Sequence, residues 1–275
     1  MKPLCLKKQT KLILILTYKA IMKKILVIGT LIVLILISML TINKFRKEIN
    51  AAKNHLVEKE RYRRNKVTNP LTDKIPESTS DLVFGLDLSH HQRSINWNKV
   101  AENPPYFIVF KTTEGSSHVD TKYKNHKENA RAKGIIVGGY HFFSYQSSGE
   151  SQAKHFLKYL NLKKGDIIPV LDVEFTKSMK SDAWIKENTT AFIETIEKEM
   201  GKKPIIYCEI AYYNRFLKPK YGDELLLWLS DFSRKPKNNF VLWQKTDKYK
   251  QVGIPGTVDY NIFNGTKEDL PTIKY

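Results

Sequence analysis

The fold is decided by the stretch Asp166-Ile-Ile-Pro-Val-Leu-Asp-Val-Glu-Phe175. Its short apolar run is rich in β-branched residues, which is typical of a strand buried on both faces of a parallel sheet. The run ends in two acids, Asp172 and Glu174. Side chains alternate along a strand, so positions i and i+2 point to the same side, about 6 to 7 Å apart. Both carboxyl groups are therefore expected in one opening.

Two carboxyl groups at this spacing can divide acid and base roles, because like charge and burial push their pKa values apart. The alternative is that Asp172 caps a helix and Glu174 is a solvated loop acid. An isolated Asp-x-Glu does not decide between these interpretations, so the rest of the chain must.

Apolar β-type runs alternate with helix-like segments along the chain. The strand-like runs are 82–88, 106–111, 135–143, 167–173 and 204–208. The helix-like segments are 97–103, 122–133, 150–160, 182–200 and 211–217, and Gly201 is an expected C-terminal stop. Three further strand-like runs follow at 225–229, 240–243 and 258–262. The sequence predicts an α/β fold, a TIM-like barrel with five βα units and three further strands.

An apolar segment precedes this barrel. Residues 25–42 carry no charged side chain and, as a helix at about 1.5 Å per residue, reach roughly 27 Å, close to the hydrocarbon thickness of a bilayer. Seven lysines and no acid precede it, so the positive-inside rule places residues 1–24 in the cytoplasm and the rest outside. We predict an uncleaved transmembrane signal anchor. The alternatives are a cleaved signal, which leaves a secreted protein, and a buried core helix.

The remaining N-terminal residues connect this segment to the barrel. Residues 43–80 are predicted to form a charged stalk and a linker with proline, serine and threonine, and residues 81–275 are predicted to form the barrel. Met22 offers an alternative start codon to Met1.

The net positive charge does not indicate nucleic-acid binding. The chain has 46 Lys and Arg against 28 Asp and Glu, but residues 1–80 hold 17 of the basic and 5 of the acidic side chains. Most of the surplus therefore lies outside the predicted barrel. Cys5 and Cys208 suggest no disulfide framework, and no cysteine and histidine spacing suggests a metal. No metal and no cofactor are predicted.

In barrels of this kind the working residues lie at the carboxyl ends of the strands. Four acids and five aromatic residues occupy those ends: Asp87, Asp172, Glu174, Asp259, Tyr140, Phe142, Tyr207, Trp228 and Trp243. Carboxyl groups can protonate a glycosidic oxygen and stabilise an oxocarbenium-like centre, and flat rings stack on sugar faces. The set therefore indicates carbohydrate chemistry.

From residue 84 to about 263 the chain resembles the glycoside hydrolase family 25 lysozymes, which are muramidases of peptidoglycan. Eight motifs carry the resemblance: Gly85-Leu-Asp-Leu-Ser89, Phe107-Ile-Val-Phe-Lys-Thr-Thr-Glu-Gly115, Gly139-Tyr-His-Phe142, Pro169-Val-Leu-Asp-Val-Glu174, Pro204-Ile-Ile-Tyr207, Leu227-Trp-Leu229, Trp243-Gln244 and Val258-Asp-Tyr-Asn261. The family fold is a barrel with five βα units and three further strands, as predicted independently above.

The resemblance implies roles for the acids. Glu174 would be the general acid that protonates the oxygen between N-acetylmuramic acid and N-acetylglucosamine. Asp172 would attack the anomeric carbon, activate water, or orient the substrate N-acetyl group so that its carbonyl oxygen attacks. Asp87 and Asp259 would bind substrate and tune this pair, and the five aromatic residues would line the cleft. The alternatives are that Asp87 is a helix cap and Asp259 a turn acid.

Other polar residues have structural interpretations. His90 and His91 are expected in a loop, His141 is expected to pack or hydrogen-bond at the rim, and Lys111 with Glu114 can form a structural ion pair.

The sequence thus predicts a membrane-anchored muramidase with a monomeric, extracytoplasmic catalytic domain that acts on peptidoglycan glycan strands in wall remodelling or lysis. Two alternatives remain: a non-catalytic, membrane-tethered glycan-binding module, and a hydrolase of another N-acetylhexosamine polymer such as chitin.

Overall fold

The structure, a computed structural model, describes residues 29, 38–39, 41–43, 45–46, 82–237 and 239–275. The chain divides into two compact units, residues 1–64 and 65–275. The predicted basic N-terminus, transmembrane helix and stalk lie wholly or mostly outside the described residues. Among those that are described, no helix is long and apolar enough to cross a bilayer.

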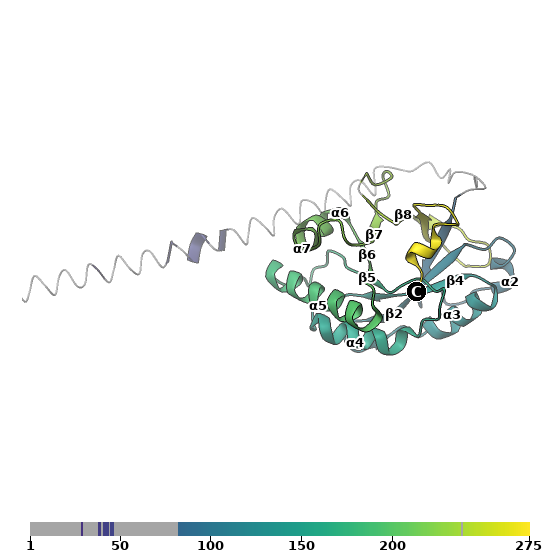
Figure 1. Cartoon of the computed structure of the whole chain (residues 1–275), viewed down its shortest axis with the longest axis horizontal. Helices are drawn as coiled ribbons and strands as arrows, with labels where there is room; N and C mark the ends of the chain where they lie inside the picture. The colour runs from purple at the N-terminus through teal and green to yellow at the C-terminus, as the bar shows by residue number, and fades with distance from the viewer. Residues whose placement is uncertain (1–28, 30–37, 40, 44, 47–81, 238) are drawn as a thin grey trace, which may run out of the picture. The chain divides into compact units, whose positions relative to one another are not determined.

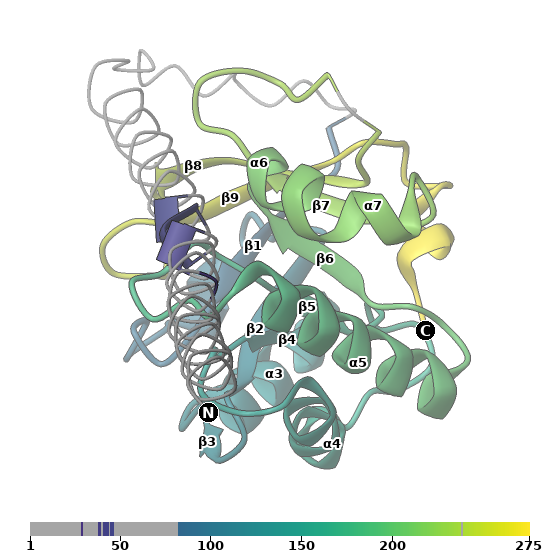
Figure 2. The ribbon, with the colours of Figure 1, turned by 90° about the vertical axis from the view of Figure 1, so that its left-hand side faces the viewer.

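In the described part of the second unit, eight strands close into a barrel (Figures 1 and 2). The strands are β1 (Phe84–Leu88), β2 (Phe107–Glu114), β4 (Ile136–Phe142), β5 (Val170–Asp172), β6 (Ile205–Cys208), β7 (Leu227–Ser230), β8 (Leu242–Tyr249) and β9 (Val258–Phe263). Neighbouring strands from β1 through β8 pair in parallel, whereas β9 is antiparallel to both β8 and β1. A short strand, β3 (His118–Val119), pairs with β2 outside the ring.

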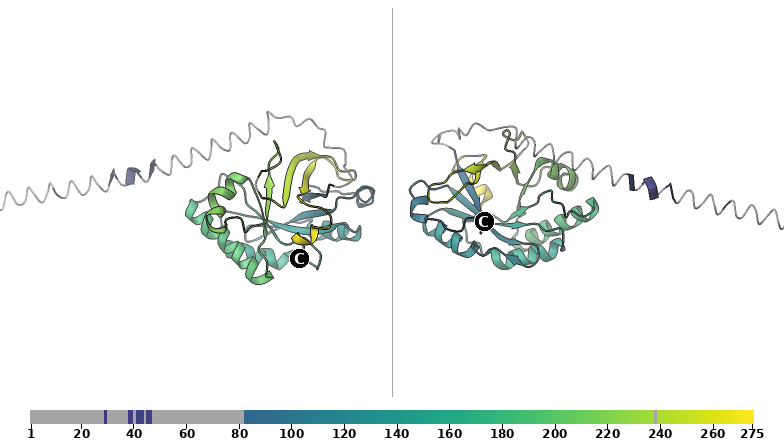
Figure 3. Two further views of the ribbon diagram at one scale, coloured as in Figure 1. Left: turned by 45° about the horizontal axis from the view of Figure 1, so that its top comes forward. Right: turned by 180° about the vertical axis from the view of Figure 1, so that it is seen from behind.

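Helices follow the first five barrel strands. They are α2 (Trp97–Val100), α3 (Tyr123–Ala132), α4 (Gly149–Leu160), α5 (Asp182–Met200), and a group made of α6 (Ile210–Tyr212), the π-helical η1 (Tyr213–Leu217) and α7 (Lys218–Tyr221). Figures 2 and 3 show α3, α4 and α5 along one side of the barrel, while β7 to β9 carry no such helices. The predicted barrel with five βα units and three further strands is confirmed.

The ends of the long helices follow from local sequence. The side chains of Ser148 and Ser181 accept hydrogen bonds from backbone N–H groups in the first turns of α4 and α5. Such caps satisfy N–H groups that have no partner within the helix. Helix α5 ends at Gly201, whose φ of 72° is the left-handed conformation that glycine adopts without strain, as predicted.

The barrel interior is filled at its amino end. Phe107, Val109, Ile205 and other inward-facing side chains form one apolar cluster with Leu270 and Ile273. These last two belong to a 3₁₀ helix, η2 (Leu270–Ile273), and Ile168 N donates to the Ile273 carbonyl at 2.9 Å. Because η2 closes this end, the opposite end, where the strands have their carboxyl termini, is left for a site.

Candidate active site

A cavity of about 190 Å³ opens at the carboxyl ends of the parallel strands, where the antiparallel β9 has its amino end. Its lining consists of Asp87, Ser89, His91, Lys111, Tyr140, Phe142, Val170, Asp172, Glu174, Tyr207, Trp228, Gln244 and Asp259. All four predicted acids and four of the five predicted aromatic residues are in this set. The structure therefore brings together side chains that lie as far apart in the sequence as Asp87 and Asp259.

The central acids come from β5 and the residues after it. Asp172 is the last residue of the strand and is 8% exposed, whereas Glu174 is partly exposed. The hydroxyl of Tyr145 donates to the backbone carbonyl of Glu174 at 2.8 Å and so holds the chain where the strand ends. This geometry places a buried and a more accessible carboxyl group beside one another.

Asp172 is an unusual acid. Burial, and then the negative charges of Glu174 and Asp87, raise the pKa of Asp172 well above its ordinary value, and the cation of Lys111 opposes them. Among the described residues, no group forms a hydrogen bond with Asp172 Oδ1, although that atom is buried. A buried polar atom without a partner is costly, so this oxygen is available to a donor from outside the chain.

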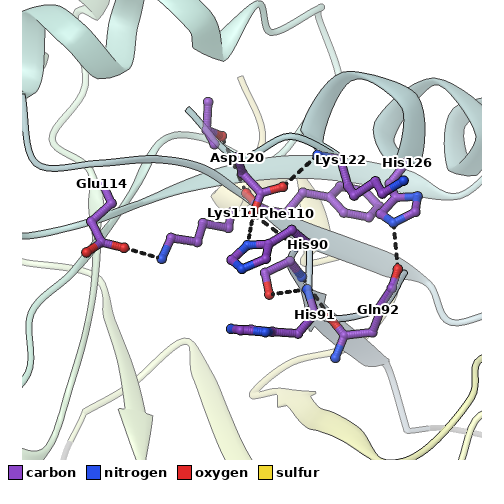
Figure 4. A network of polar contacts seen from close by, with 11 residues as sticks. His90, His91, Gln92, Phe110, Lys111, Glu114, Asp120, Lys122 and His126 are labelled. Carbon is purple, nitrogen blue, oxygen red and sulfur yellow. Dashed lines mark hydrogen bonds and ion pairs between the residues drawn. The ribbon is translucent and has the colours of Figure 1, made fainter. Parts of the chain in front are cut away.

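Lys111 brings a positive charge into the cavity. Its ammonium lies 2.5 Å from Glu114 Oε2 (Figure 4) and 4.8 Å from the centre of the Phe142 ring. The Lys111 side chain is 12% exposed and that of Glu114 is 41% exposed. The predicted ion pair is confirmed, and it also contributes an inward-facing cation near Asp172.

Asp87 and Asp259 face each other across β1 and β9. They are directly paired residues of the antiparallel ladder, so neither is a helix cap or a turn acid. Burial raises the pKa of Asp87, and hydrogen bonds with Asn261, Asp259 and Gln244 oppose the rise. Asn261 Nδ2 donates to Asp87 Oδ2 at 2.8 Å, and Gln244 Nε2 donates to the same oxygen at 3.3 Å.

The aromatic residues anchor these amides. The Trp228 indole N–H donates to Asn261 Oδ1 at 2.9 Å, and the Tyr207 hydroxyl donates to Gln244 Oε1 at 2.9 Å. The rings of Tyr207 and Trp228 stand nearly perpendicular, with centroids 5.3 Å apart. Sequence reasoning assigned no site role to Asn261 or Gln244. The signal was available for Asn261, which lies two residues after Asp259 and therefore faces the same side of β9.

Trp243 does not line the cavity. It neighbours Gln244 on β8, and because Gln244 faces inward, Trp243 must face outward. It is 9% exposed and belongs to an apolar cluster that also holds side chains of α4, α5 and η1. Its indole N–H donates to the Asp231 carbonyl at 2.7 Å. The prediction that all five aromatic residues line the cleft therefore does not hold for this one.

His90 and His141 make structural contacts, the first in a loop and the second in the core. His90 Nδ1 lies 2.8 Å from Asp120 Oδ2, and the His90 backbone N–H donates to the same oxygen (Figure 4). His141 is buried between Thr113 Oγ1 and Gln152 Oε1, and burial lowers its pKa to about 3. Within the described residues, no group of three or more histidine, cysteine or acidic side chains could hold a metal ion.

A closed barrel with carboxyl groups and aromatic rings gathered at the carboxyl ends of its strands is the arrangement of a glycoside hydrolase. Comparison with known proteins gives the particular family. The family model described as "Glycosyl hydrolases family 25" matches residues 86–254. The chain belongs to this family and is a glycosyl hydrolase.

Three similar proteins illustrate this, two of them with names that agree with the assignment. Protein YegX of Escherichia coli (strain K12) is 34% identical over 206 residues, which cover 72% of this chain and 74% of YegX. Lysozyme M1 of Streptomyces globisporus is 28% identical over 216 residues, which cover 71% of this chain and 72% of that enzyme. The solved structure of a family 25 glycosyl hydrolase from Bacillus anthracis has a TM-score of 0.66 and 28% identity, and the match covers 72% of this chain and 96% of that one.

Proposed function

We propose that this chain hydrolyses the β-1,4 bond between N-acetylmuramic acid and N-acetylglucosamine in peptidoglycan, with Glu174 as general acid and Asp172 as its partner. The observation that carries the proposal is the single cavity in which both residues meet Asp87, Asp259 and the ring of Tyr140. The similarity to Lysozyme M1 supports the choice of substrate.

The two central carboxyl groups differ in a way that suits different roles. Glu174 is the more accessible and can reach a glycosidic oxygen. Burial and the neighbouring acids raise the pKa of Asp172, which disfavours the carboxylate form that a nucleophile needs. Its buried Oδ1 makes no hydrogen bond to the described residues and can accept one from the N–H of an acetamido group. Of the three roles considered for Asp172, the orientation of the substrate N-acetyl group for attack by its own carbonyl oxygen fits best.

The aromatic residues that line the cavity differ in exposure. Trp228 is 1% exposed, and its N–H donates to Asn261, so it does not offer a face to a sugar. Tyr140, Phe142 and Tyr207 also line the cavity and are partly exposed. Sugar rings present apolar C–H faces, so we assign the stacking role to these three residues.

We further propose that the predicted anchor at residues 25–42 holds a monomeric barrel on the outer side of the membrane, where it meets the wall. This arrangement suits an enzyme that remodels the wall of its own cell. The support is the apolar run and its flanking lysines.

The test is digestion of peptidoglycan by the full-length chain and by Glu174→Gln. The wild type should release reducing ends, and the variant should be slower by about 10²-fold or more, because general acid catalysis contributes at least that much. Glu150→Gln is the matched control, since Glu150 is an exposed acid on α4 paired with Lys154. It should behave as the wild type.

The same assay separates the alternatives. Retention of the chain on wall glycan without any turnover would indicate a binding module. Turnover of chitin at a rate equal to that of peptidoglycan would indicate a less specific N-acetylhexosamine hydrolase.

A further inference from the structure

The central acids lie on and just after the shortest strand of the barrel. β5 has three residues, whereas each of the other barrel strands has at least four. It pairs with β4 on one side and with β6 on the other, and Asp172 is its last paired residue in both registers. Glu174 lies two residues beyond these pairs, so strand pairing alone does not fix its position.

Both chain neighbours of Glu174 are held on the outer side of the barrel. Val173 is fully buried, and its backbone N–H donates to the Tyr207 carbonyl at 3.0 Å. The ring of Phe175 meets the ring of Tyr212 edge-on, with centroids 5.3 Å apart. Val173 and Phe175 both contact the apolar cluster that contains side chains of α4 and α5. Glu174 lies between them and lines the cavity instead.

Two buried tyrosines meet at the end of β5. Tyr145 follows β4 and Tyr212 belongs to α6 after β6, so they come from the two strands that flank β5 (Figure 2). Tyr145 is 1% exposed and Tyr212 is fully buried. The Tyr145 hydroxyl donates to the Glu174 carbonyl at 2.8 Å, and its oxygen lies 3.0 Å from the hydroxyl oxygen of Tyr212. The two hydroxyls therefore link the neighbours of β5 to the backbone of Glu174.

The chemistry of the groups fixes the direction of these hydrogen bonds. A carbonyl oxygen can only accept, so the single hydroxyl proton of Tyr145 is committed to Glu174. Tyr145 can then only accept from Tyr212, which makes Tyr212 the first donor of a two-step chain. Burial raises the pKa of both hydroxyls, so both keep their protons at neutral pH.

We propose that Tyr145 and Tyr212 are positioning residues that hold Glu174 in place at the glycosidic oxygen. This role rests on the proposed function of Glu174 as general acid. The cavity lining includes neither tyrosine, so both act through the backbone of Glu174 and not on the sugar. A displacement of about 1 Å at a catalytic group can cost about 10²-fold in rate. Loss of the hydrogen bond that holds this peptide should therefore affect turnover more than binding.

The first test separates turnover from binding. In the full-length chain, Tyr145→Phe removes one oxygen and keeps the ring. Its kcat on soluble peptidoglycan strands should fall about tenfold or more, while KM stays within about twofold of the wild type. Tyr213→Phe is the matched control, since the buried Tyr213 also donates its hydroxyl to a backbone carbonyl, that of Gly222, outside the cavity lining. The control should turn over as the wild type does, and an equal kcat for the two variants would overturn the proposal.

The second test uses a readout that a purely structural role would not move. A dinitrophenyl β-glycoside of N-acetylmuramic acid has a leaving group that departs without protonation, so its cleavage needs no general acid. The loss caused by Tyr145→Phe should therefore be at least about fivefold smaller on this substrate than on peptidoglycan. Equal losses on both substrates would show that the hydroxyl supports only the fold.

The same two substrates keep the proposal separate from the proposed function. Glu174→Gln should lose far more activity on peptidoglycan than on the dinitrophenyl glycoside. If it loses none on peptidoglycan, the assignment of Glu174 as general acid fails. If it behaves as expected while Tyr145→Phe matches the wild type, only the role of the tyrosines fails.

The third test asks whether the two hydroxyls act as a chain. Tyr212→Phe leaves Tyr145 able to donate to Glu174, so its kcat should fall by less than that of Tyr145→Phe. The variant with both substitutions should be no slower than Tyr145→Phe alone, because Tyr212 acts only through Tyr145. Losses that multiply would contradict the chain. If Tyr145→Phe does not fold, Tyr212→Phe decides, and a kcat equal to that of Tyr213→Phe would then overturn the proposal.

Discussion

Asp172→Asn should make the protein more stable while it removes activity. Asp172 is 8% exposed, and burial together with neighbouring acids raises its pKa in the folded state. In the unfolded chain the pKa of an aspartate is about 3.9. Between these two values the folded state holds a proton that the unfolded state has released. The contribution of Asp172 to the stability of the folded state is therefore greatest below pH 4. This contribution is lost as the pH rises through the folded-state pKa.

The size of the effect follows from proton linkage. Replacing Asp172 by asparagine keeps the shape of the side chain and removes the titration. The difference in unfolding free energy between the variant and the wild type should grow by up to about 1.4 kcal/mol per pH unit above pH 4 and then level off. Coupling to Glu174 and Asp87 spreads this growth over a wider pH range.

The assay is urea denaturation of the full-length wild type and variant at several pH values between 4 and 8. Asp223→Asn is a matched control on an exposed loop, and its difference from the wild type should not change with pH in this manner. A difference for Asp172→Asn that stays constant, or that becomes less favourable as the pH rises, would refute the idea that Asp172 is a destabilised buried acid.

Three further substitutions test other parts of the structure. Trp228→Phe leaves the buried Asn261 oxygen without its indole donor, so the free energy of unfolding measured with urea should fall by about 1 to 3 kcal/mol. Turnover of peptidoglycan should fall as well, and unchanged turnover would argue against a role of this contact in the site. Arg131→Met removes the two hydrogen bonds, at 2.7 and 2.8 Å, that Arg131 donates to the buried Asp166, and it leaves that acid with the Lys163 backbone N–H but without its ion-pair partner. The free energy of unfolding should fall by about 3 to 5 kcal/mol in the same assay; a loss below about 1 kcal/mol would contradict this. Trp243→Phe lies outside the cavity and should leave KM for peptidoglycan near that of the wild type, whereas a large rise in KM would place Trp243 in substrate binding after all.

Local pattern was sufficient for the barrel and for its central acids. The period of two along a strand predicted that Asp172 and Glu174 share one opening, and both line the cavity. The alternation of strands and helices predicted the five βα units. These features depend on short-range patterns that the amino-acid sequence contains directly.

The meeting of Asp87 with Asp259 could not be predicted from local pattern. It arises because β9 returns antiparallel beside β1 and closes the ring, which is a tertiary event. The rule that working residues lie at strand ends placed both residues at one rim, but it did not predict that they are directly paired.

Two differences from the prediction concern β8. The strand continues to Tyr249, beyond the predicted end at Trp243, because its polar second half pairs with β9 as an antiparallel extension and needs no apolar run. Trp243 and Gln244 are adjacent, so only one of them can face inward. A large aromatic residue was the natural choice for the cavity, but the outer layer of side chains buries it instead.

The most direct test of the central claim is the identity of the new reducing end after digestion. Defined peptidoglycan is treated with the wild-type chain and with Glu174→Gln, the products are reduced with borohydride, and the sugar alcohols are identified. The account predicts that the wild type produces the alcohol of N-acetylmuramic acid and that the variant produces almost none. Production of the alcohol of N-acetylglucosamine, or equal product from both proteins, would contradict it.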